Sequence, residues 1–214
     1  MSHQFITNED RLLTDVINNI LPSAAKLDFL VGYFYFSGFK EIYKNLDGKH
    51  VRILVGLDVE KDIINAVREC ETVTERNISR GQIRDNHNKW FVKLYNETDF
   101  FDSEENQEAF KIFLEKIKTG SLEIKKTLEP NHAKLYIFEN KPEHSQKGDF
   151  PGTVITGSSN LSRAGLRDRH EINVVFRDEH FKEARELFDT LWGKAVTIAD
   201  MNNFEFFRKE VIEK

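Results

Sequence analysis

The alternation of apolar and polar residues predicts strands and helices that follow one another along the chain. KLDFLVGYFYF (26–36) is apolar on both faces, which is typical of a strand in the middle of a sheet covered on both sides. HVRILVGLDVE (50–60) repeats this pattern, with a strand to about Leu57 and with Asp58 as the cap of a second helix. A helix capped by Ser37 and ending near Gly48 lies between the two strands. We therefore expect a βαβα opening with parallel pairing.

Helical periodicity surrounds these strands. TNEDRLLTDVINNILP (7–22) predicts an amphipathic helix capped by Thr7 and stopped by Pro22. Residues 61–118 have a mainly helical pattern, and 201–214 predict a short amphipathic helix. A helix over 178–195 is expected to direct five apolar side chains inward: Phe181, Ala184, Leu187, Phe188 and Leu191. Between them, SLEIKKTL, HAKLYIF, TVIT and HEINVVF have the pattern of strands.

These elements predict an α/β fold, with a mixed, largely parallel β-sheet flanked by helices on both faces, in one domain spanning residues 1–214. The 214 residues are 39% hydrophobic and 31% charged, which is ordinary for a chain with one full-sized core. The single Cys70 permits no internal disulfide, and the first ten residues lack the pattern of a signal peptide. We expect a cytoplasmic protein without membrane association, because the densest apolar run is far shorter than the ~20 residues of a spanning helix.

Charge is unevenly distributed. The formal net charge is −5, which argues against nucleic-acid binding over the whole surface. Residues 119–170 contain 8 Lys or Arg and 6 Asp or Glu, so this segment carries +2 and the remainder carries −7. A positive segment on an acidic body is compatible with a phosphodiester substrate.

The positive segment contains a histidine and a lysine at strand spacing. In NHAKLYIFE (131–139) the period of a strand places His132, Lys134 and Tyr136 on one face. An ammonium about 7 Å from an imidazole, two residues along a strand, repels a metal ion and attracts a phosphate. We interpret Tyr136 as a wall of the site rather than as a reagent.

A second polar group follows the next predicted strand. In TVITGSSNLSRAGL (153–166), Gly157 permits a sharp turn that exposes Ser158, Ser159 and Asn160 as donors for an oxyanion. HEINVVF (170–176) then carries Glu171 as one of its few charged residues. A carboxylate there needs a partner, and an imidazole N–H is a natural one.

This combination resembles the phospholipase D superfamily, whose signature is H-x-K, four residues, Asp, and then G-S-x-N. The chain has His132, Lys134, Glu139, Gly157, Ser158 and Asn160 in that order, with Glu171 eleven positions after Asn160 as in small bacterial members. Glu139 replaces the usual Asp, and an insertion, NKPEHSQKGDFPG, separates the two halves. A weaker resemblance over Val31–Leu46 extends to PLD-like domains fused ahead of helicases or found in restriction systems.

The resemblance implies a metal-independent phosphodiesterase, with a nuclease acting on DNA or RNA as the preferred interpretation. His132 would form a phosphohistidine, while Lys134, Ser158 and Asn160 would bind the phosphate. Glu171 would fix the tautomer of His132. No metal or other cofactor is implied. Because one chain holds one motif, we expect a homodimer in which two His132 side chains meet across a twofold axis.

Two other functions remain open. The chain could be a noncatalytic nucleic-acid-binding or assembly domain of a larger helicase or restriction protein, or have such a protein as a partner. A phospholipase or phosphatidyl transferase is less favoured, because no hydrophobic surface helix rich in Lys or Arg is evident.

Several other polar residues are interpreted as surface features. His87 and Lys89 repeat the H-x-K spacing without a G-S-x-N. We also expect surface positions for His144, His170 and His180. An acidic cluster is expected at a helix start, where negative charge is favourable: Glu97, Asp99, Asp102, Glu104, Glu105 and Glu108.

Overall fold

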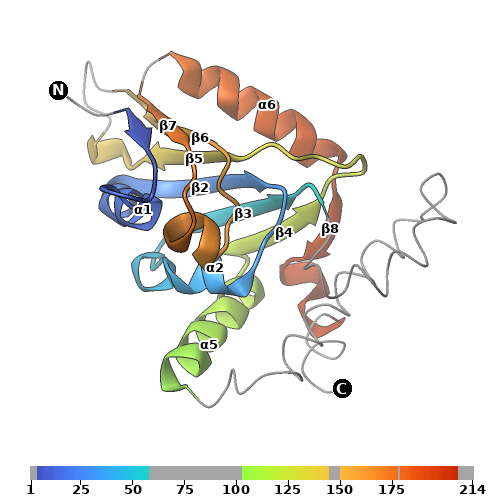
Figure 1. Ribbon diagram of the computed structural model, residues 1–214. Coiled ribbons are helices and arrows are strands. Elements are labelled where there is room, and N and C mark those ends of the chain that lie inside the picture. The colour runs from blue at the N-terminus through green and yellow to red at the C-terminus, as the bar shows by residue number, and fades with distance from the viewer. Residues whose placement is uncertain (1–3, 58–102, 145–149, 178, 207–214) are drawn as a thin grey trace, which may run out of the picture.

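A mixed sheet of eight strands organises the residues that this computed structural model describes, namely 4–57, 103–144, 150–177 and 179–206 (Figure 1). The strand order is β1-β7-β6-β5-β2-β3-β4-β8. The strands are β1 (Phe5–Ile6), β2 (Ala24–Val31), β3 (His50–Val55), β4 (Leu122–Lys126), β5 (Leu135–Asn140), β6 (Gly152–Gly157), β7 (Asn173–Phe176) and β8 (Val196–Ala199). Parallel pairing joins β2 to β3 and β3 to β4, and the other neighbours run antiparallel. The predicted α/β fold with a mixed sheet is confirmed, but the sheet is not largely parallel, because five of its seven strand pairings are antiparallel.

Helices cover both faces of the sheet. Helix α6 (His180–Lys194) lies on one face, whereas α1 (Leu13–Ile20), α2 (Phe36–Lys40) and α5 (Glu104–Lys118) lie on the other (Figure 1). Short turns connect these elements: η1 (Leu21–Ser23), η2 (Tyr43–Asn45), η4 (Pro142–His144), the π-helical turn η5 (Ala164–Asp168) and η6 (Met201–Asn203). In the described part of the chain, no helix has the length and apolar character needed to cross a membrane.

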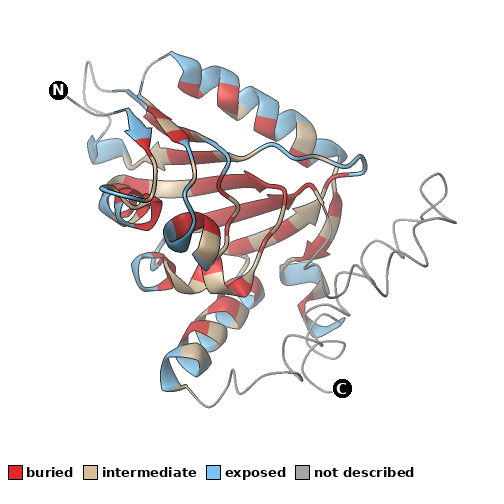
Figure 2. Ribbon diagram, viewed as in Figure 1, coloured by how far each residue is buried: buried red, intermediate tan, exposed pale blue. Residues whose placement is uncertain are grey.

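Apolar side chains form a core on each face of the sheet (Figure 2). Successive residues of a strand point to opposite faces, so Phe29 packs toward α5 while Leu30 packs toward α6. On the α6 side, Phe188 and Trp192 cover the sheet with their rings 5.7 Å apart. This double-sided burial is why β2 has an almost continuous apolar sequence.

A cluster of charged side chains lies between the sheet and α6, with Asp28 buried and with Glu139 and Asp189 41% and 48% exposed. The guanidinium of Arg52 donates to buried Asp28 at 2.6 and 2.8 Å and to Asp189 at 2.6 Å. Arg185 of α6 lies 3.5 Å from Asp28 and donates to Glu139 at 2.7 Å. Buried charges require such partners. Glu139, the residue that departs from the phospholipase D signature, forms an ion pair between β5 and Arg185 of α6.

The first helix begins later than predicted. Thr7 is not its cap, because α1 starts at Leu13. Asn8 adopts a φ of 63°, a left-handed conformation that Asn tolerates well. Its side-chain oxygen accepts the Leu13 N–H at 2.8 Å, and its amide donates to the carbonyls of Gly165 and Arg169 at 2.9 and 3.0 Å. Asn8 thus ties the start of the chain to the turn that follows β6.

Two other predictions were wrong in detail. The helix expected from Ser37 to Gly48 is divided into α2 and η2, with Ser37 inside α2. Leu187 is 57% exposed, because the buried stripe of α6 runs instead through its neighbour Phe188 to Trp192. The short strands β1 and β8 were not predicted.

Candidate active site

The candidate site lies at the edge of the sheet where β2, β3 and β6 end and where β5 and β7 begin (Figure 1). The strand register brings these ends together, because Leu135 pairs with Leu30 on one side and with Thr156 on the other. Farther along, Gly157 pairs with Asn173 at the start of β7. Both halves of the sequence motif therefore meet at one edge.

Lys134 and Asn160 converge above Gly32, the residue that follows β2. A Cβ atom at Gly32 would lie 3.2 Å from Asn160 Oδ1 and 3.4 Å from Lys134 Nζ. The Tyr33 N–H donates to the same Asn160 oxygen at 2.9 Å, which leaves the amide N–H groups of Asn160 for another acceptor. An ammonium and an amide at one place are suitable donors for the nonbridging oxygens of a phosphate.

The partial burial of Lys134 strengthens the attraction of its ammonium group for an anion. Its ammonium donates to the His132 carbonyl at 2.5 Å and is partly buried. This burial lowers the pKa of Lys134, while the negative charge of Glu171 opposes the shift. A partly desolvated cation attracts an anion more strongly than one surrounded by water, because the local dielectric constant is lower. Lys134 therefore supplies a focused positive charge at this edge.

Ser158 and Glu171 form the second part of the site. The Ser158 hydroxyl donates to the Glu171 carboxylate and accepts the Ile172 N–H at 3.0 Å. The Ser158 N–H donates to the Ile172 carbonyl at 3.1 Å. A Cβ atom at Gly157 would lie 2.2 Å from that carbonyl oxygen, so this close approach of two backbones requires glycine. The turn after β6 is thus fastened to the segment that carries Glu171.

Two buried residues, Asn173 and Tyr136, support the turn between Ser158 and Asn160. The Asn173 amide donates to the Ser159 hydroxyl at 2.9 Å and accepts the Ser159 N–H at 3.3 Å. The Tyr136 hydroxyl donates to the Ser159 carbonyl at 2.9 Å, and burial strongly raises the pKa of this phenol. Tyr136 is fully buried in the core and therefore supports the turn from beneath. Asn173 was missed, although an amide in the otherwise apolar NVVF strand was an available signal.

His132 lies at the exposed rim of the site. The predicted strand over 131–139 begins only at Leu135, because Asn131 donates its N–H to Gly56 at 2.9 Å and accepts the Ala133 N–H at 2.8 Å. No hydrogen bond of the His132 imidazole occurs within the described part of the chain. The Glu171 carboxylate instead accepts from Ser158, so its contact with His132 stays a prediction.

The other polar residues singled out from the sequence lie away from this edge or outside the described residues. His170 contacts Glu9 at 3.1 Å on the surface, and His144 and His180 are also exposed. Glu105, at the start of α5, lies 3.1 Å from Lys40. Across the described ranges, no group of three or more His, Cys, Asp or Glu side chains is placed to hold a metal ion. Outside the described residues lie His87, Lys89, Glu97, Asp99 and Asp102.

Comparison with known proteins adds a family match. Residues 17–192 match the family model described as cardiolipin synthase, PLD-like domain. Among solved structures, NucT from Helicobacter pylori is 11% identical, with a TM-score of 0.46 over 90% of this chain and 96% of that chain. Nuc from Salmonella typhimurium, described as a phospholipase D family member, is 15% identical, with a TM-score of 0.41 over 86% and 88%. A polyphosphate kinase from Porphyromonas gingivalis is 11% identical, with a TM-score of 0.44 over 89% and 22%. No curated protein sequence matches the chain.

Proposed function

The chain belongs to the PLD-like domain family, and on this premise we propose that it is a metal-independent phosphodiesterase that cleaves nucleic acid through a phosphohistidine. The observation that carries the proposal is the convergence of Lys134 and Asn160 above Gly32, beside the segment that bears His132. Two donors at one point, one of them a partly buried cation, suit the oxygens of a phosphodiester. We assign the imidazole of His132 the role of the nucleophile.

In the first step, an imidazole nitrogen of His132 attacks phosphorus. The P–N bond forms as the bond between phosphorus and the leaving oxygen breaks, and that oxygen takes a proton from a general acid. Lys134 and Asn160 hold the nonbridging oxygens as negative charge grows on them. Because the Lys134 ammonium supplies the positive charge, the scheme requires no divalent metal.

In the second step, water attacks the phosphohistidine. The group that acted as the acid now removes a proton from this water, the P–O bond forms, and the P–N bond breaks to release His132. Ser158 holds the Glu171 carboxylate in place. We assign Glu171 the role of accepting the imidazole N–H of His132 once substrate is bound, which favours the tautomer that can attack.

The general acid must stand opposite His132, in line with the leaving oxygen. The chain offers one H-x-K paired with one G-S-x-N. We propose that a second copy supplies the acid, so that two His132 side chains exchange roles across a twofold axis. The exposed position of His132 at the sheet edge supports this arrangement, because the imidazole is open to a partner.

The test is hydrolysis of a plain oligonucleotide and of a phospholipid, each with and without EDTA. We expect cleavage of the oligonucleotide at an unchanged rate in EDTA. Loss of that activity on chelation, restored by Mg²⁺ or Zn²⁺, would exclude the metal-free mechanism. Cleavage of the phospholipid alone would favour the lipase alternative, and oligonucleotide binding without cleavage would favour a noncatalytic domain.

A further inference from the structure

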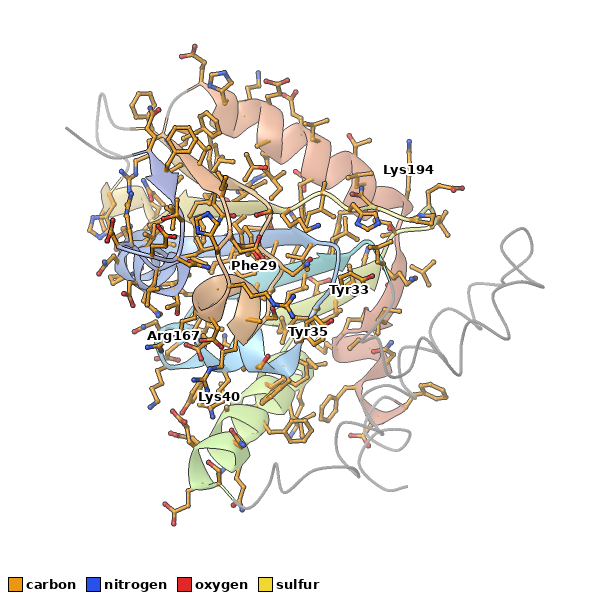
Figure 3. All side chains as sticks on the ribbon, viewed as in Figure 1. Phe29, Tyr33, Tyr35, Lys40, Arg167 and Lys194 are labelled. Carbon is orange, nitrogen blue, oxygen red and sulfur yellow. The ribbon has the colours of Figure 1, made fainter. Side chains whose placement is uncertain are left out.

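The segment that follows β2 carries aromatic residues on alternating sides. Phe34 and Phe36 are 2% and 1% exposed and pack with Phe113 of α5 in the core. Tyr33 and Tyr35 point the other way and are partly exposed, with ring centroids 6.3 Å apart and planes inclined by 40°. Figure 3 shows both tyrosines beyond the carboxyl end of β2. The chain therefore presents an aromatic pair at the same edge as the candidate site.

This pair is connected directly to the phosphate-binding donors. Tyr33 follows Gly32, the residue above which Lys134 and Asn160 meet. The Tyr33 N–H fixes the Asn160 side chain, and the Tyr35 N–H donates to the Leu161 carbonyl at 3.0 Å. Two backbone contacts thus hold the aromatic segment against the turn that contains Asn160. A phosphate bound by Lys134 and Asn160 would place its neighbouring groups beside Tyr33.

We propose that Tyr33, with Tyr35 beside it, stacks on a nucleobase next to the bound phosphate, and that the substrate is a single-stranded nucleic acid. This inference rests on the proposed function, because it assumes that Lys134 and Asn160 bind a phosphodiester. Bases of a single strand are free to stack on aromatic side chains, whereas bases of a duplex already stack on one another. An aromatic ring accepts any base, so the contact confers affinity without sequence preference.

The test measures binding separately from catalysis. A fluorescent single-stranded oligonucleotide is titrated with the full chain carrying His132→Ala, and the dissociation constant is read from anisotropy. Adding Tyr33→Ala should weaken binding by roughly 5- to 150-fold, the usual effect of losing one stacked base. Tyr33→Phe should bind as tightly as the parent, because it keeps the ring. Tyr33→Leu keeps apolar bulk without a flat ring and should bind as weakly as Tyr33→Ala.

Phe150→Ala is the matched control, since Phe150 is a 49% exposed aromatic at the opposite edge of the sheet, before β6. It should leave the dissociation constant unchanged. In a series of oligonucleotides that each lack one base at a different position, Tyr33→Ala should no longer weaken binding when the missing base is the one that stacks on Tyr33. A duplex should bind weakly to every variant. Equal binding by Tyr33→Leu and the parent, or preferential binding of phospholipid vesicles, would overturn the inference.

The outcomes separate this inference from the function on which it rests. If the wild-type chain hydrolyses no phosphodiester but Tyr33→Ala still weakens oligonucleotide binding, the catalytic proposal fails and the stacking site stands. If the wild-type chain cleaves oligonucleotides and Tyr33→Ala changes neither binding nor KM, the stacking site alone is refuted.

Discussion

The side-chain amide of Asn173 binds Ser159 through both of its ends, donating to the hydroxyl and accepting the N–H. Both residues are completely buried. Ser159 lies between Ser158 and Asn160, so this pairing sets the position of Asn160, which we assign to phosphate binding, and of Ser158, which holds Glu171. Asn173 is thus a positioning residue that acts through the turn.

Replacing Asn173 with Ala should therefore lower both stability and activity. Two buried groups of Ser159 lose their partner, which costs about 1–3 kcal/mol of the free energy of unfolding. Urea denaturation measures this loss, and kcat should fall as the turn relaxes. Asn202→Ala is the matched control, because Asn202 is an exposed asparagine in η6. A normal kcat in a destabilised Asn173→Ala chain would mean that the pairing serves folding only.

Lys134→Met should lower the activity of the chain and raise its stability. Removing the ammonium should reduce kcat/KM on an oligonucleotide by about 10²- to 10³-fold, as expected for the loss of one electrostatic contact in the transition state. The same change should make the folded chain more stable at neutral pH, because a charge no longer has to be partly buried. Lys182→Met, which removes an exposed lysine of α6, should change neither quantity appreciably.

The stability gained in Lys134→Met should depend on pH. Burial lowers the pKa of Lys134 below its ordinary value of 10.5. At neutral pH the group is charged in the folded and the unfolded chain, so the cost of burying the charge is fully present. That cost fades as pH rises from the lowered pKa of the folded state toward 10.5, since the lysine becomes neutral. Urea denaturation should show that the difference in the free energy of unfolding between Lys134→Met and the wild-type chain decreases over this pH range. An increase in this difference would contradict the assignment.

Co-expression of wild-type and His132→Ala chains tests the shared site. With equal amounts and random pairing, about one quarter of the dimers hold two wild-type chains. A mixed dimer would lack either the nucleophile or the acid, so activity per total protein should fall toward that quarter. A site contained within one subunit would leave about half. Mass spectrometry of the intact dimers confirms random pairing, and a value near half would require a second acid within the chain.

Sequence reasoning located the motif because its chemistry is carried by residue type and spacing. The structure brings Lys134, Ser158, Asn160 and Glu171 to one edge, with His132 at the rim. The contact between Tyr33 and Asn160 could not be predicted, because it joins residues 127 positions apart. No local pattern encodes such a contact, since it arises only when β2 and β6, which lie on either side of β5, end at the same edge of the sheet.

In the fold as well, local sequence patterns predicted elements, whereas long-range contacts set some of their boundaries. The two-sided apolar pattern over 26–36 predicted β2, although the strand ends at Val31, and the helical pattern over 61–118 includes α5. The late start of α1 depends on Asn8, whose partners Gly165 and Arg169 lie far along the chain. Asn131 likewise delays β5 through a bond to Gly56. The predicted starts of α1 and β5 were therefore wrong, because in each case a polar side chain or backbone group forms a hydrogen bond with a residue far along the chain.

The most direct test of the central claim is the kcat of His132→Ala on a single-stranded oligonucleotide in EDTA. Loss of the nucleophile should reduce kcat by ~10³-fold or more. His170→Ala is the matched control, because His170 is an exposed histidine that contacts Glu9. We predict a wild-type rate for His170→Ala and a nearly inactive, fully folded His132→Ala chain. Equal rates for the two variants would contradict the phosphohistidine mechanism.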